Sequence, residues 1–193
     1  MFELYVCDTE TTGTDFIKHS PIEITLFSMT TGQLKTWWLK PIDMDNIDPG
    51  ALRVNGHKLE DITHQTSEGK LKYKDPNKVI VEIENWLAEN DNSSAEQRIL
   101  VGHNIYFDYY HSLYLWKKCG AEDSFPYGRR MIDTMNLEFI INHISSTTVD
   151  SYALSALCKK YGIKNEKAHT AEADTKATRD VFLKQLDFFK KNA

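Results

Sequence analysis

Short apolar runs separated by polar turns dominate the first part of the chain. Residues 2–8 alternate between apolar and polar side chains and lead into a segment rich in threonine and glycine, which is typical of a strand followed by a turn. Residues 22–27 and 34–39 predict two further strands. The turn signal at residues 30–32 joins these two strands into a hairpin.

The rest of the chain alternates helical patterns with short apolar runs. Asp48 and Pro49 predict a short helix with the aspartate as cap and the proline at the first helical position, ending at residues 55–56. Residues 99–101 predict a buried strand, and residues 131–134 a short strand or turn. Apolar stripes and closing glycines predict further helices over residues 79–87, 107–119, 152–161 and 171–190.

This order of elements predicts an α/β fold with three layers, in which a mixed central sheet of about five strands is flanked by helices. The 193 residues contain no internal repeat and no low-complexity tract, so we expect a single domain over residues 1–193. Hydrophobic residues make up 41% of the chain and charged residues 26%, which is typical of a globular protein.

The net charge of −5 argues against a protein that coats duplex nucleic acid through a broad basic face. It allows a protein that grips only a strand end, because a metal site can supply positive charge locally. Residues 67–78 predict an exposed basic loop, more typical of a solvated segment than of one that follows phosphates. Its notable residues are Lys70, Lys72, Tyr73, Lys74 and Lys78.

The three cysteines, Cys7, Cys119 and Cys158, are widely spaced and form no C-x-x-C pair. This pattern indicates neither a disulfide framework nor a zinc site, and favours buried free thiols in a reducing compartment. No secretory signal and no apolar run of membrane-spanning length is visible, so we expect a cytoplasmic protein, cellular or viral, with no membrane partner.

Four carboxylates and one histidine stand beside predicted strands and helices. Asp8 and Glu10 are two residues apart, so both point the same way if the first strand persists that far. Asp108 lies in the first turn of a helix, where it could also simply stabilise the helix start. Asp174 heads an apolar helical stripe, and His169 precedes that helix, where its imidazole could accept a proton from water.

Each of these residues has an ordinary structural explanation when it is taken alone. Together they would repel one another if the fold gathered them at one point, and a divalent cation would cancel that repulsion. Oxygen ligands suit magnesium or manganese. The pattern therefore predicts a metal-dependent enzyme that acts on phosphate esters.

The segments DTETTG at residues 8–13, HNIYFD at 103–108 and HTAEAD at 169–174 resemble the three motifs of the DEDDh exonucleases. This family includes polymerase proofreading subunits, ribonuclease T and oligoribonuclease. Two smaller segments, at residues 49–56 and 132–134, agree with it, and the resemblance spans nearly the whole chain.

The resemblance implies a ribonuclease-H-like fold and two Mg²⁺ or Mn²⁺ ions. Asp8 would bridge both ions, Glu10 and Asp174 would complete the ligands of one, and Asp108 would support the site mostly through water. His169 would deprotonate the attacking water.

The resemblance also implies contacts to the strand end from Thr11, Thr12 and Gly13, with Phe107 against a base. Independently of the resemblance, His103 and Asn104 could position the substrate backbone or cap the turn before the helix. The sequence departs from the family at residues 55–57, where many relatives have histidine before the glycine and, after it, an aliphatic residue wedged against the last bases. His57 stands in the aliphatic place and is therefore a candidate substrate contact. How the terminal base is held, and with it any preference for DNA or RNA, therefore stays open.

The leading hypothesis is a 3′–5′ exonuclease that releases 5′-mononucleotides from single-stranded or frayed DNA. The alternatives are an exoribonuclease that trims RNA ends or short oligonucleotides, and a non-catalytic module that binds strand ends or a polymerase. A polymerase or another replication or repair protein is a candidate partner. The sequence carries no signal for an oligomeric state.

Overall fold

The computed structural model describes residues 2–63, 72–166 and 168–192, and these residues form five β-strands, seven α-helices and two short 3₁₀ helices. The strands are β1 (Glu3–Thr11), β2 (Pro21–Ser28), β3 (Leu34–Trp38), β4 (Arg98–Gly102) and β5 (Met131–Asp133). The helices are α1 (Pro49–Asn55), α2 (Leu59–Thr63), α3 (Pro76–Asn90), α4 (Ile105–Lys118), α5 (Thr134–Ser145), α6 (Leu154–Tyr161) and α7 (Ala171–Asn192), with 3₁₀ helices at Ala95–Gln97 and Glu122–Ser124.

The five strands form one mixed sheet in the order β3-β2-β1-β4-β5. The β1–β2 and β2–β3 pairs are antiparallel, while β1–β4 and β4–β5 are parallel. The parallel half requires crossover connections, which α3 and α4 supply between β1, β4 and β5. The mixed five-stranded sheet confirms the predicted fold class.

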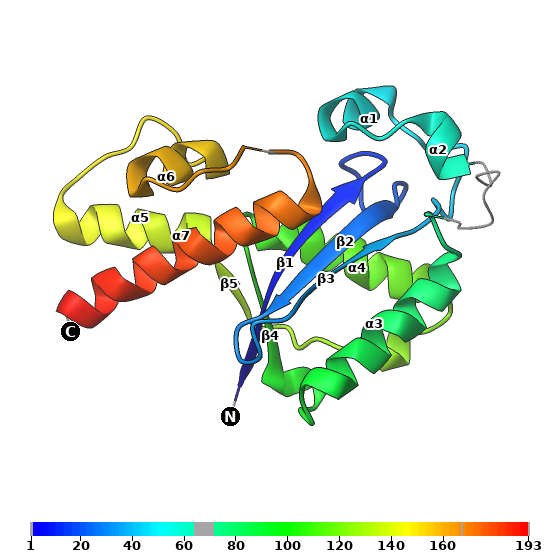
Figure 1. Cartoon of the computed structure of the whole chain (residues 1–193), viewed down its shortest axis with the longest axis horizontal. Helices are drawn as coiled ribbons and strands as arrows, with labels where there is room; N and C mark the ends of the chain where they lie inside the picture. The colour runs from blue at the N-terminus through cyan, green and yellow to red at the C-terminus, as the bar shows by residue number, and fades with distance from the viewer. Residues whose placement is uncertain (1, 64–71, 167, 193) are drawn as a thin grey trace.

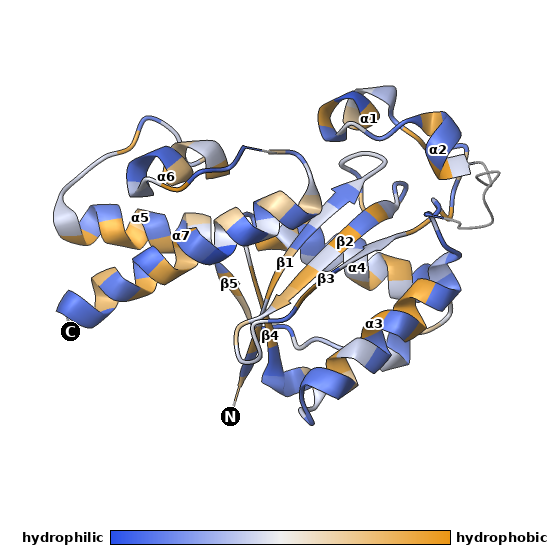
Figure 2. Ribbon diagram, in the orientation of Figure 1, coloured by the Kyte–Doolittle hydropathy of each residue, from blue (hydrophilic) through white to orange (hydrophobic). Residues whose placement is uncertain are grey.

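Helices cover both faces of this sheet (Figure 1). On one face, Val6 of β1 and Val101 of β4 form a buried cluster with Phe182 of α7. On the other face, side chains of β1 and β4 pack in a larger cluster with residues such as Ile83 of α3 and Leu115 of α4. Hydrophilic and hydrophobic residues alternate along α3 and α7, as expected of helices with one face on a core (Figure 2).

The structure contains each strand predicted from the sequence, with boundaries shifted by up to three residues. It also confirms the helix at Pro49, because Asp48 caps it by accepting the Gly50 amide at 2.7 Å and Gly56 ends it in the left-handed region. Two helices, α2 and α5, were not predicted, and α3 begins earlier than expected.

The prediction of an exposed loop over residues 67–78 was wrong at its end, because residues 76–78 form the first turn of α3. Asp75 caps α3 and Pro76 follows it, the same signal that was recognised at Asp48 and Pro49. Lys74 pairs with Glu82 of this helix at 2.8 Å. Residues 67–71 of the predicted loop, with Lys70, lie outside the described residues.

The cysteines lie largely where the sequence placed them. All three cysteines are free; Cys7 and Cys158 are buried, and Cys119 is half-buried. Three of the four tryptophans are in the core, while Trp38 is half-buried with the Lys72 amine over its ring. Within the described residues, no helix combines the length and the apolar character that crossing a bilayer requires.

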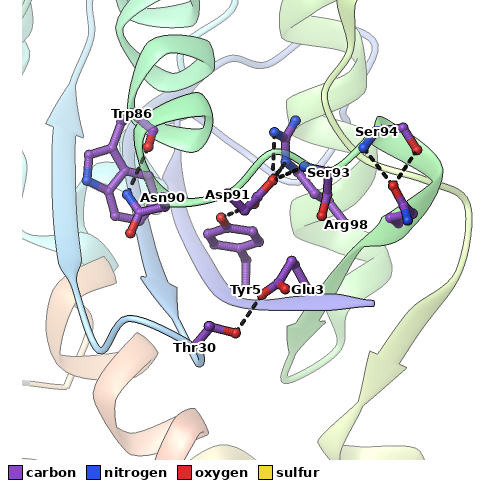
Figure 3. A network of polar contacts seen from close by, with 10 residues as sticks. Glu3, Tyr5, Thr30, Trp86, Asn90, Asp91, Ser93, Ser94 and Arg98 are labelled. Carbon is purple, nitrogen blue, oxygen red and sulfur yellow. Dashed lines mark hydrogen bonds and ion pairs between the residues drawn. The ribbon is translucent and has the colours of Figure 1, made fainter. Parts of the chain in front are cut away.

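A polar network ties the end of α3 to the amino-terminal part of β1, away from its carboxyl end (Figure 3). The Asp91 carboxylate accepts hydrogen bonds from the guanidinium of Arg98, at 2.9 Å, and from the Tyr5 hydroxyl. Burial alone would raise the pKa of Asp91, but hydrogen bonds from Arg98, Tyr5 and the Ser93 amide hold it below its ordinary value. The network joins the end of α3 to β1 and to Arg98, the first residue of β4.

Replacing Asp91 should destabilise the fold. The Asp91→Ala variant leaves the Arg98 guanidinium, whose side chain is 12% exposed, without its carboxylate partner. We expect the free energy of unfolding to fall by about 3 kcal/mol in urea denaturation at pH 7. Glu89→Ala, an exposed position on the same helix, is the control and should change stability by less than about 0.5 kcal/mol. Equal stabilities for the two variants would contradict this role.

Candidate active site

Strand β1 carries the first two acidic residues on one of its faces. The strand runs to Thr11, so both Asp8 and Glu10 lie within it. Val6, two residues earlier, packs with Phe182 of α7. Because side chains alternate along a strand, Asp8 and Glu10 lie on the face of the sheet that α7 covers.

Helix α7 brings a third carboxylate to the same place. Asp174 lies in its first turn, where the helix dipole favours an anion. One oxygen atom from each of Asp8, Glu10 and Asp174 can be chosen so that all three lie within 4.8 Å of one another. All three residues are half-buried. The fold thus joins carboxylates from opposite ends of the chain.

Asp108 approaches β1 from α4, on the opposite side of the sheet from α7. It lies in the first turn of α4 and is only 3% exposed. Thr9, which stands between the two acidic residues of β1, donates a hydrogen bond to Asp108 at 2.8 Å. Asp108 is therefore fixed against β1, although it does not belong to the group of three oxygens described above.

The proximity of these carboxylates changes their acidity. Burial, followed by the charges of Asp108 and Asp174, raises the pKa of Asp8 well above its ordinary value. Burial and the charges of Glu23 and Asp174 raise the pKa of Glu10 to about 8. Burial likewise raises the pKa of Asp108 to about 7, against the lowering effect of its hydrogen bonds from Thr9. Ionisation of Asp8, Glu10 and Asp108 is therefore electrostatically unfavourable in the metal-free protein.

These residues fit a divalent cation. Their ligand atoms are carboxylate oxygens, which suit Mg²⁺ or Mn²⁺. Among the residues that the structure describes, no lysine or arginine forms an ion pair with Asp8 or Glu10. A cation would offset the repulsion that raises their pKa values.

His169 stands at the edge of this cluster, on the segment between α6 and α7. Its backbone is in the left-handed region, with φ of 68°. Its amide donates a hydrogen bond to Asp174 Oδ2 at 2.9 Å, and the residue is exposed. The main chain of His169 is therefore attached to the cluster, while its side chain lies where solvent can reach it.

Hydrogen bonds and close packing hold the carboxyl end of β1 in place. The carbonyl of Thr11 accepts a hydrogen bond from the Asn55 side chain at 3.0 Å, and its hydroxyl donates to the Gly13 carbonyl at 2.7 Å. Thr12 is fully buried. A Cβ atom at Gly13 would come within 2.4 Å of the His19 ring, so this position has room only for glycine unless that ring moves.

Asn104 and Phe107 lie at the start of α4. Asn104 is exposed and adopts the left-handed conformation, with φ of 60°. Its backbone N–H donates a hydrogen bond to Asp133 Oδ1 at 3.1 Å. Phe107 is half-buried, and its ring centre lies 4.4 Å from that of His111. Both residues precede Asp108 and lie at the end of α4 that carries it.

The side chain of His57 is hydrogen-bonded to other residues of the protein and does not reach the three carboxylates directly. Its ring lies between the Tyr73 hydroxyl, at 2.6 Å from Nδ1, and the Glu23 carboxylate, at 3.1 Å from Nε2. Only 6% of its side chain is exposed. Glu23 is the partner of Glu10 across the β1–β2 pair, so His57 reaches the site through another side chain. Its contact with a nucleotide stays a prediction.

Sequence reasoning missed several residues of the site. Glu23 and Asn165 carried no recognisable signal, because they become neighbours of the acidic residues only through strand pairing and a loop. Thr9 lies inside the first motif and Asp133 inside the small segment at residues 132–134, so motif position could have marked both. Asn55 was noted only as a departure from the family pattern.

A cavity of about 540 Å³ opens beside the cluster, between β2–β3 and the start of α7. Glu23 and Trp38 line it on the sheet side, and Asn165 and Ala173 on the side of α7. The three carboxylates do not line the cavity themselves, but two of their partners do: Glu23 is paired with Glu10, and Asn165 donates a hydrogen bond to Asp174.

The chain belongs to the RNase T family of exonucleases, whose family model matches residues 5–182. Among curated proteins, it is 27% identical to the PolC-type DNA polymerase III of Thermotoga maritima over 168 residues, which is 81% of this chain and 12% of that protein. It is 26% identical to the PolC-type DNA polymerase III of Staphylococcus aureus strain RF122 over 190 residues, which is 96% of this chain and 11% of that protein. The chain thus spans only about an eighth of the length of these relatives.

Solved structures share the fold. The Escherichia coli exonuclease I–single-stranded DNA complex in its zinc-bound form matches with a TM-score of 0.76 at 17% identity, over 100% of this chain and 41% of that one. Exonuclease I from Methylocaldum szegediense matches with a TM-score of 0.73 at 21% identity, over 96% of this chain and 40% of that one. These structures support the fold, and the match to the family model over residues 5–182 confirms the resemblance to an exonuclease family noted in the sequence.

The raised pKa values predict how a cation should stabilise the protein. In the metal-free protein, Glu10 titrates near 8 instead of its ordinary 4.5, so its contribution to stability is present below about pH 4.5 and is lost as pH rises through 8. A bound cation removes this loss but must displace protons at low pH. We expect the rise in Tm caused by a fixed Mn²⁺ concentration to be larger at pH 8 than at pH 6 in calorimetry. The Asp8→Ala control should show little rise at either pH, and an equal rise at both pH values in the unsubstituted protein would contradict the coupling.

Proposed function

We propose that this chain is a metal-dependent 3′–5′ exonuclease that releases 5′-mononucleotides from single-stranded or frayed DNA ends. The observation that carries the proposal is the meeting of three carboxylates from β1 and α7 within 4.8 Å, with His169 attached to one of them. Membership of the exonuclease family supports the reaction class.

Asp8, Glu10 and Asp174 would hold the cations, and Asp108 would support the site from α4. Cations bound there would supply positive charge that stabilises the attacking and leaving oxygens of an in-line displacement. Asp8 and Glu10 are suited to this because β1 directs both toward one point, and Thr9 keeps Asp108 against the same strand.

His169 is the proposed general base. A water molecule attacks the last phosphodiester phosphorus while an imidazole nitrogen of His169 takes its proton. The bond from phosphorus to the 3′ oxygen of the penultimate nucleotide breaks, and that oxygen takes up a proton from solvent. The exposed side chain of His169 can return its proton to solvent before the next cycle.

The strand end is proposed to lie along Thr11, Thr12 and Gly13, with a base against Phe107 and the backbone near Asn104. The buried, hydrogen-bonded end of β1 offers a rigid surface for the terminal sugar. Stacking on an aromatic ring tolerates any base, which suits an enzyme that removes successive nucleotides.

DNA as substrate is supported by the relatives. Solved exonuclease I structures of this fold contain single-stranded DNA or oligonucleotides such as dT13. The curated relatives are DNA polymerases in which the matching region is a small part, and this favours a polymerase as partner.

The test of substrate is an assay on matched 5′-labelled DNA and RNA oligonucleotides with Mn²⁺, and again with excess chelator. We expect stepwise shortening of the DNA from its 3′ end, release of 5′-mononucleotides, slower loss of the RNA, and no cleavage with chelator. Faster loss of the RNA would favour the exoribonuclease. Binding without cleavage under any metal condition would favour the non-catalytic module.

The test of the general base is His169→Ala. We expect turnover to fall by about 10²–10⁴-fold with little change in oligonucleotide binding, because proton removal from water is lost while the carboxylates stay in place. His143→Ala, an exposed histidine on α5, is the control and should keep full activity. Turnover of His169→Ala within twofold of the control between pH 6 and 8 would remove His169 from this role.

A further inference from the structure

Asp174 is held by two groups of the segment that joins α6 to α7. The Asn165 side-chain amide donates to Asp174 Oδ1 at 2.6 Å, and the His169 amide donates to Oδ2 at 2.9 Å. Each oxygen therefore has a donor from the same segment, and each keeps a second lone pair. The two hydrogen bonds fix the rotation of the carboxylate relative to α7.

This restraint acts against the repulsion in the cluster. Asp174 raises the pKa values of both Asp8 and Glu10, so the three carboxylates disfavour one another without a cation. A free Asp174 side chain would rotate away from its neighbours. The short hydrogen bond from Asn165 holds one oxygen on the loop side, which leaves the remaining lone pairs available toward β1.

The orientation of the Asn165 amide is set by this contact. Its own oxygen is buried and finds no hydrogen-bond donor in the part of the chain that the structure describes. Turning the amide over would place that oxygen against the Asp174 oxygen, where two acceptors would repel each other. The chain therefore leaves one buried carbonyl unsatisfied while keeping an amide on Asp174, which points to a role for this contact beyond loop packing.

The same contact links Asp174 to His169. Gly162 ends α6 in the left-handed region, and Thr170 begins α7 by accepting the Ala173 amide at 3.3 Å. Between these ends, hydrogen bonds from Asn165 and His169 attach the segment to Asp174. Asn165 thus anchors the segment that carries His169, the proposed base, to the Asp174 carboxylate, which would also bind the cation.

We propose that Asn165 is a positioning residue of this active site, which orients Asp174 for the cation and anchors the His169 segment against it. The inference rests on the proposed function for its catalytic consequence, but its effect on cation binding is independent of any nuclease assay. Partners that orient metal ligands typically account for 10–100-fold in metal affinity or activity.

The experiment measures Mn²⁺ binding by calorimetry, and kcat and KM on a single-stranded DNA oligonucleotide, for Asn165→Ala, Asn165→Gln and the control Glu166→Ala. Glu166 is the next residue and is exposed. We expect Asn165→Ala to raise the Mn²⁺ dissociation constant about 10–100-fold and to lower kcat by a similar factor at saturating Mn²⁺, with KM nearly unchanged. Asn165→Gln keeps the amide and should recover part of both losses, while the control should match the unsubstituted protein.

Circular dichroism and Tm of the metal-free variants report whether they are folded. An Asn165→Ala protein that loses only Tm, with an unchanged Mn²⁺ dissociation constant and kcat, would overturn the proposal and leave a structural role. If the unsubstituted protein binds Mn²⁺ but cleaves no oligonucleotide, the proposed function fails, and the Mn²⁺ constants of the variants still decide the role of Asn165. If the unsubstituted protein binds no Mn²⁺, both proposals fall.

Discussion

The repulsion among carboxylates at the end of β1 is the constraint on which the rest of the site depends. Burial raises the pKa values of Asp8 and Glu10, and the nearby charge of Asp174 raises both further. A fold pays such a cost only where other interactions hold the chain in place. Here the interior β1 strand, paired on both sides, and the buried face of α7 supply that restraint.

The arrangement of the sheet explains why the acidic residues meet. Strand β1 lies in the middle of the sheet, so both faces of its carboxyl end are covered, by α7 on one side and by α4 on the other. Alternation along β1 then directs Asp8 and Glu10 to α7 while Thr9 reaches Asp108 on α4. One short segment thereby receives carboxylates from two helices that are distant in the sequence.

The sequence predicts the strands and the helices that have strong local signals, because alternation, proline caps and closing glycines act within a few residues. The helix α5 was missed because its apolar residues are too numerous to form a stripe, and several of them, such as Phe139 and Ile144, are exposed. The helix α2 is too short to show a period. The start of α3 was missed because the lysines around Asp75 were interpreted as a loop.

The three acidic motifs could be recognised from spacing and residue type, because chemistry restricts those positions. The neighbours that orient them could not, since Glu23 meets Glu10 through strand register and Asn165 meets Asp174 through the path of a loop. The ring of His57, which was expected at the substrate, lies between Tyr73 and Glu23 because a polar residue stands where the family usually has an aliphatic one.

The most direct measurement is anomalous diffraction at the manganese edge from crystals of this protein grown with Mn²⁺. The account predicts a peak bonded to oxygens of Asp8, Glu10 and Asp174, with the amide of Asn165 still on Asp174. A peak elsewhere on the molecule, with these three carboxylates apart and no ion between them, would contradict it.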